Sequence, residues 1–124
     1  MRDEMNGYRE NYVQSLASYK ARPLDGAWAT PPYLHNASVP TLYALLSPAA
    51  ERPKKFYLGH REYDPKDVGY EYQEPLPGGF EMDTTLAGNS NAGHEFKDGN
   101  GKGVIGPLLK PGQRRALVEY LKTL

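Results

Sequence analysis

The sequence predicts a mainly α-helical, loop-rich domain with a small antiparallel β insertion. Apolar side chains recur at helical spacing near both ends, in residues 7–20 and 110–124. Short aromatic runs bounded by proline and glycine fill residues 54–85 and are typical of strands. The 13 glycines and 11 prolines account for the expected loops. A chain of 124 residues supports one modest core, so residues 1–124 are expected to form a single domain.

The first predicted helix runs from Gly7 to Lys20. Its apolar face has aromatic and leucine side chains at i, i+4, i+8 and i+11, which are Tyr8, Tyr12, Leu16 and Tyr19. The residue before a proline is pushed out of helical dihedral angles, so this helix should end before Pro23.

Residues 22–36 are predicted to form a fixed loop because prolines and a glycine interrupt any helix there. Trp28, Tyr33 and Leu34 are large and apolar, so the loop should lie against a flat apolar surface, either core or cofactor. A short helix is then predicted, with Ser38 as its cap and Pro40 in its first turn. Its leucines recur at helical spacing, and Ser47, Pro48 and Pro53 close it.

The β insertion at residues 54–85 is expected to contain three strands of one small sheet, Lys54–Gly59, Gly69–Gln73 and Phe80–Thr85, with a turn at Pro75–Gly79. Leu86–Lys110 is rich in glycine and asparagine and predicts a long packed loop or a linker. The last helix, Lys110–Leu124, has proline in its first turn and apolar residues at i, i+3, i+4 and i+7, namely Leu117, Tyr120, Leu121 and Leu124.

Charge and motifs exclude several classes of function. Fifteen basic and fifteen acidic side chains cancel without forming blocks, which argues against nucleic acid or an anionic membrane as a partner. No apolar run approaches the ~18 residues of a membrane span, and Met1–Glu10 is too charged for a signal peptide. Hydrolase, metalloprotease and phosphate-loop motifs are absent from the sequence.

One segment carries a specific resemblance. The sequence ATPPYLHNASVPTL, residues 29–42, resembles a motif of bacterial dihaem cytochrome c peroxidases. The longer segment Tyr19–Gly59 is more similar to the large c-type cytochromes related to rubber oxygenases. SNAGHEF and the closing RRALVEYLKTL extend a weaker likeness, with Tyr120 at the place of an aromatic that packs near the haem edge. The resemblance implies a partial cytochrome c-like domain, haem as cofactor and electron transfer as function.

The resemblance also implies roles for individual residues. His94, in the glycine loop SNAGHEF, is the candidate axial ligand of the haem iron, held at its other ring nitrogen by Glu95 or a backbone carbonyl. His35 is expected to be structural, while Trp28 and Tyr33 wall the pocket or form an aromatic step between redox centres.

The ordinary alternatives stay open for each of these side chains. They are a local hydrogen bond for His94 and core packing for Trp28. Arg22 is the candidate partner of a haem propionate, or it bridges to Asp25 or Glu51. Asp25 stands where the peroxidases have an arginine. Met82 is the weaker thioether alternative as ligand, because it lies in a predicted strand.

The chain has no cysteine and therefore lacks the CxxCH motif that attaches c-type haem covalently. The expectation is a C-terminal part of a longer periplasmic cytochrome, or the product of a shortened gene, whose upstream domain or chain bears the haem. The parent protein could be a dihaem peroxidase or an oxygenase, but this chain alone is not expected to be catalytic. The alternative is a haem-free binding or interaction module that uses its tyrosine-rich ribbon as a contact surface.

Overall fold

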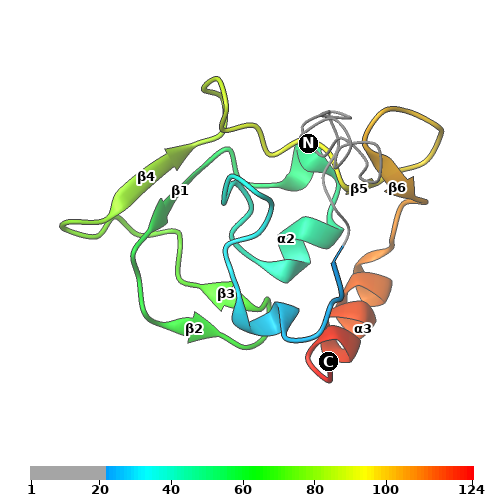
Figure 1. The fold of residues 1–124 in the computed structure, drawn as a ribbon, viewed down its shortest axis with the longest axis horizontal. Helices are drawn as coiled ribbons and strands as arrows, with labels where there is room; N and C mark the ends of the chain where they lie inside the picture. The colour runs from blue at the N-terminus through cyan, green and yellow to red at the C-terminus, as the bar shows by residue number, and fades with distance from the viewer. Residues whose placement is uncertain (1–21) are drawn as a thin grey trace, which may run out of the picture.

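A computed structural model of the chain describes residues 22–124, and Figure 1 shows its ribbon. Short elements alternate with long irregular connections. In chain order they are η1 (Ala27–Ala29), α2 (Leu42–Leu46), η2 (Ala49–Glu51), β1 (Lys55–Leu58), β2 (Tyr63–Asp64), β3 (Gly69–Tyr70), β4 (Phe80–Asp83), β5 (Glu95–Phe96), β6 (Val104–Gly106) and α3 (Pro111–Leu121).

Helix α2 lies at the centre of the molecule and contacts α3 and β5 (Figure 1). It begins at Leu42 because the Thr41 hydroxyl accepts the amide of Ala44 at 3.1 Å. The predicted cap, Ser38, lies before the helix and donates its hydroxyl to Ser90 instead. Around α2 lies the main apolar core, made of Tyr33, Val39, Leu42, Ala44, Leu46, Val68, Val118 and Leu121.

Strand β3 passes close to the segment that precedes α2. Gly69 forms an isolated bridge with Thr41, and the amide of Leu42 donates to the carbonyl of Val68 at 3.0 Å. A side chain at position 69 would collide with the carbonyl oxygen of Pro40. Only glycine therefore fits at this position, where the backbone of β3 lies close to the backbone that precedes α2. This contact joins the β region to the core around α2.

The strands form three separate two-stranded ladders. Strands β1 and β4 pair antiparallel, as do β2 and β3, whereas β5 and β6 pair in parallel. Each of the three predicted strand segments contains a strand, and the predicted turn is found at Pro77–Gly78. The prediction of one common sheet was wrong, because β1–β4 and β2–β3 do not share a strand. Strands β2, β5 and β6 were not predicted.

The predicted fold class, mainly α with a β insertion, is also wrong. The helices of the described residues are confined to the five residues of α2, the eleven of α3 and two short 3-10 turns, and strands and loops make up the rest. Glycine and proline punctuate residues 47–110 so closely that no long helix can extend there. The final helix was confirmed as α3, with Pro111 at its start. The helix predicted at Gly7–Lys20 lies outside the described residues.

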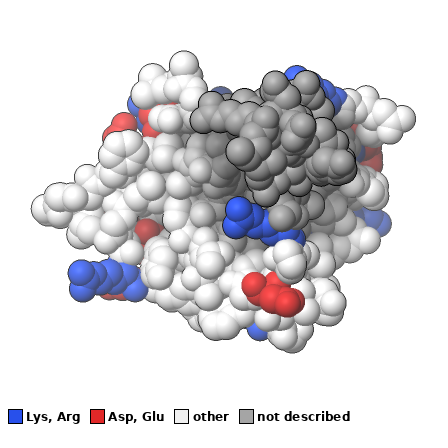
Figure 2. Space-filling model, in the orientation of Figure 1, with Lys and Arg blue, Asp and Glu red and all other residues white. Residues whose placement is uncertain are grey.

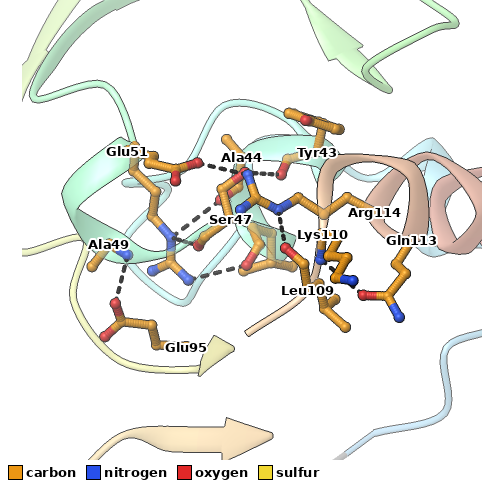
Figure 3. A network of polar contacts seen from close by, with 12 residues as sticks. Tyr43, Ala44, Ser47, Ala49, Glu51, Glu95, Leu109, Lys110, Gln113 and Arg114 are labelled. Carbon is orange, nitrogen blue, oxygen red and sulfur yellow. Dashed lines mark hydrogen bonds and ion pairs between the residues drawn. The ribbon is translucent and has the colours of Figure 1, made fainter. Parts of the chain in front are cut away.

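Two arginines of α3 fix it to its neighbours. Arg114 is buried and donates to Glu51 at 2.6 Å and to the carbonyl of Leu109 at 3.0 Å (Figure 3). Burial disfavours the charged form of Arg114 and by itself would lower its pKa. The hydrogen bond and negative charge of Glu51 outweigh burial, so the pKa of Arg114 is raised. Arg115 stacks on the Tyr43 ring, 3.9 Å from its centroid, and pairs with Asp67. Helix α3 is thus held against α2 by charge as well as by apolar packing.

The surface charge agrees with the balanced composition. In Figure 2 the described basic and acidic side chains lie in small separate groups, and they form no large area of one sign on this face. Within residues 22–124, no helix is both long and apolar enough to cross a membrane.

Candidate functional site

An apolar groove of about 340 Å³ opens beside the core. Its volume falls in the range of small-molecule and cofactor pockets, roughly 300–1,000 Å³. Its lining comes from the loop before α2, from α2, from the β5–β6 region and from α3. The lining residues are Leu24, Ala27, Tyr33, Leu42, Leu45, Leu46, His94, Phe96, Ile105, Leu117 and Leu121. His94 is the one imidazole among these described residues, and the others are almost entirely hydrocarbon.

Hydrogen bonds fix the loop on one side of the groove. The amide of Gly26 donates to the carbonyl of Leu124 at 3.2 Å, which ties η1 to the end of α3. The Tyr33 hydroxyl donates to the carbonyl of Ala27 at 2.8 Å, and the Tyr33 backbone pairs with Val39. Burial of this side chain raises the pKa of Tyr33 far above its usual range, so the phenol stays neutral.

His94, which also lines the groove, has an unusual backbone conformation. Its φ of 47° is left-handed, and Gly93 before it has a φ of 91°. Such dihedral angles are uncommon for a residue with a side chain and persist where surrounding contacts impose them. Contacts from other parts of the chain must therefore hold this turn.

Arg52 provides that constraint. Only 2% of this residue is exposed, and its guanidinium donates to main-chain carbonyls on both α2 and the His94 loop. Towards α2 the acceptors are Ala44, Leu45 and Ser47, at 3.0–3.2 Å. Towards the loop they are Asn91, Gly93 at 2.9 Å and His94 at 3.1 Å. Burial lowers the pKa of Arg52, but six carbonyl acceptors satisfy its charge.

The segment that carries the cytochrome resemblance also binds the His94 loop. The Asn36 amide donates to the carbonyls of Gly88 at 3.1 Å and Ser90 at 2.9 Å, and the Ser38 hydroxyl donates to Ser90 at 3.0 Å. Asn91 in turn donates to the carbonyl of Pro53 at 3.1 Å. Two stretches far apart in sequence are therefore held in one rigid arrangement.

Glu95 links the loop to the turn that follows α2. Its carboxylate accepts the amide of Ala49 at 2.8 Å, which ties β5 to η2 (Figure 3). The side chain thus helps to dock the loop on α2 and its C-terminal extension.

The predicted site residues divide into two groups. Tyr33 and His94 line the same groove. Trp28 is 42% exposed in η1, and His35 and Arg22 are exposed; these three are not part of the groove lining among the described residues. The carbonyl of Trp28 accepts the Tyr63 hydroxyl at 2.8 Å, which connects η1 to β2.

Sequence reasoning missed Arg52, the residue that joins the two sides of the site. It stands in ERPKK, a run that has the composition of a solvated surface segment. Nothing in that run distinguishes the one buried cation from its exposed neighbours, and only the flanking Pro48 and Pro53 hint at a fixed turn. The leucines of α2 were predicted to form one face of a helix, but the groove that they line was not predicted.

The segment that contains the loop, α2 and Arg52 matches a known protein family. Residues 18–57 match the RoxA-like, cytochrome c-like family, which shows a cytochrome c-like relation and associates the chain with haem binding and electron transfer. The matched segment contains Tyr33, Asn36, Ser38 and Arg52, whereas His94 lies beyond it.

Two longer relatives come from Sinorhizobium fredii (strain NBRC 101917 / NGR234). The uncharacterized protein y4iJ is 65% identical over 123 residues, which are 99% of this chain and 20% of that protein. The uncharacterized protein y4iM is 40% identical over 123 residues, covering 88% of this chain and 28% of that protein. The chain therefore spans about a fifth and just over a quarter of the two relatives it matches.

Proposed function

We propose that this chain forms one wall of a haem site in a larger periplasmic c-type cytochrome and takes part in electron transfer there. The observation that carries the proposal is the meeting of Tyr33 and His94 in one apolar groove. One residue belongs to the cytochrome c-like segment and the other to a loop that this segment holds in place.

The residues of the groove fit a porphyrin in chemistry. A macrocycle needs an apolar cradle, and an axial site needs a ligating nitrogen, which the imidazole of His94 can supply. The chain has no cysteine, so in this proposal the haem is attached covalently to a domain or chain outside this one. Bound haem would supply one-electron redox chemistry.

The chain's own residues would tune that site. The leucines of α2 and α3 exclude water from it, which affects both dielectric and access. Arg52 fixes the backbone of His94 and so the direction of approach of its ring. In this proposal exposed Arg22 pairs with a propionate and exposed Trp28 forms an aromatic step towards a second centre, with His35 structural.

Adding ferric haem to the purified 124-residue chain tests the proposal. Without any added imidazole, wild type is expected to give the saturable Soret spectrum of histidine-ligated haem, because the only axial imidazole that the described residues place in the groove is then that of His94. His94→Ala is expected to lose that spectrum, because the chain then has no imidazole in the groove. His35→Ala and His60→Ala serve as matched controls and should bind like wild type. Spectra that are identical for wild type and His94→Ala would remove His94 as the ligand.

The second candidate is a haem-free interaction module. Tyr63 and Tyr70 pair across β2 and β3 and remain 39% and 40% exposed, as tyrosines at contact surfaces do. Under this alternative wild type would show no saturable Soret change, and the ribbon rather than the groove would be the functional surface.

A further inference from the structure

We propose that a second pocket, which is lined by three tyrosines of the β region, binds a small quaternary ammonium compound. This pocket has a volume of about 250 Å³ and lies between the proline loop and the strands β1 and β3. It shares no residue with the groove that contains His94. The lining residues are Pro31, Pro32, Pro40, Tyr57, Leu58, Gly59, His60, Tyr70, Glu71 and Tyr72.

Three tyrosines and one carboxylate distinguish this pocket chemically. Tyr57, Tyr70 and Tyr72 line it together with Glu71, and no lysine or arginine is among its described lining residues. Aromatic faces carry negative potential and attract cations, and aromatic cages are the recurring solution for quaternary ammonium groups. The charge of the pocket therefore complements a cation and opposes a phosphate or a carboxylate.

The aromatic side chains are held in place before any ligand binds. Tyr72 makes an edge contact with Phe56, with ring centroids 6.2 Å apart, and Tyr70 makes one with Tyr63 at 5.9 Å. The amide of Tyr57 donates to the carbonyl of Tyr72 at 2.8 Å, which joins two walls of the pocket. Binding would therefore cost little side-chain entropy.

The scarcity of side-chain hydrogen-bond acceptors favours a methylated cation over a primary amine. Three of the lining residues are prolines and one is a leucine, and their side chains offer no acceptor for an ammonium proton. The His60 ring nitrogen donates to the carbonyl of Glu74 at 2.6 Å, and one Glu71 oxygen accepts the amide of Gln73 at 2.6 Å. A primary ammonium needs acceptors for three protons, whereas a trimethylammonium group needs only apolar walls and negative potential.

Titration of the full chain with choline, followed by NMR at constant ionic strength, tests this site. Choline and tetramethylammonium are expected to shift the ring signals of the pocket tyrosines in a saturable way. The neutral isostere 3,3-dimethylbutan-1-ol is expected to bind roughly tenfold more weakly, because it has the shape without the charge. Equal binding of choline and the isostere would overturn the proposal.

Variants distinguish choline binding in this pocket from non-specific binding to apolar surface. Tyr72→Leu is expected to weaken choline binding roughly tenfold, while Tyr120→Leu, an exposed tyrosine on α3, should leave it unchanged. Glu71→Gln keeps an oxygen for the Gln73 amide and should still weaken binding, so it tests charge even if Tyr72→Leu is poorly folded. Wild-type affinity in Glu71→Gln together with wild-type affinity in a folded Tyr72→Leu would contradict the assignment.

Discussion

Arg52→Met is expected to lower the free energy of unfolding by about 3–5 kcal/mol. The reason is the set of six carbonyl oxygens that Arg52 satisfies between α2 and the His94 loop. Methionine fills similar volume but donates nothing, so buried acceptors lose their partners. Urea unfolding followed by circular dichroism measures the change.

Two further variants make the result interpretable. Arg61→Met removes the same charge from an exposed position and should change stability by less than about 0.5 kcal/mol. Arg52→Lys should lie between wild type and Arg52→Met, because an ammonium offers three donors without the fork of a guanidinium. If Arg52→Met were as stable as Arg61→Met, the two sides of the site would not depend on this arginine.

Phe56→Ala is expected to cost about 3–5 kcal/mol, as truncation of a buried phenylalanine does. Phe56 is 1% exposed, makes an edge contact with Tyr72 and faces Met82 across the β1–β4 ladder. Its loss would leave a cavity in the β region and would release the Tyr72 ring. Urea unfolding measures the loss in stability, and choline titration reports the effect on Tyr72.

The partner strand provides the control. Phe80 lies opposite Leu58 in the same ladder but is 58% exposed, so Phe80→Ala should cost less than about 0.5 kcal/mol. Similar losses in both variants would mean that β1 and β4 are not packed as described, with one phenylalanine inside and one outside.

Local sequence patterns were sufficient for some elements and insufficient for others. Helix α3 was predictable because apolar residues recur at its periodicity and a proline opens it. Strands β1 and β4 were predictable from their aromatic and bounding residues. Strands β5 and β6 were not, because two or three residues within a glycine-rich loop have no detectable periodicity, and their parallel pairing depends on contacts made elsewhere.

The site shows the same limit. The resemblance singled out Tyr33 and His94 separately, but their position on one groove follows from Asn36, Ser38 and Arg52, whose hydrogen bonds to the His94 loop join residues far apart in sequence. The helical periodicity near the two ends of the chain also led to the wrong fold class. Helical patterns at residues 7–20 and 110–124 suggested a mainly α domain, although the residues between them hold three small ladders.

The haem-site account can be tested directly by NMR of the chain labelled in its three histidine rings. On addition of ferric haem, the account predicts that the His94 ring signals move far outside the diamagnetic range, because that ring binds the iron. The signals of His35 and His60 should stay within it. Bound haem that leaves His94 unshifted, or that shifts His35 or His60 in its place, would contradict the account.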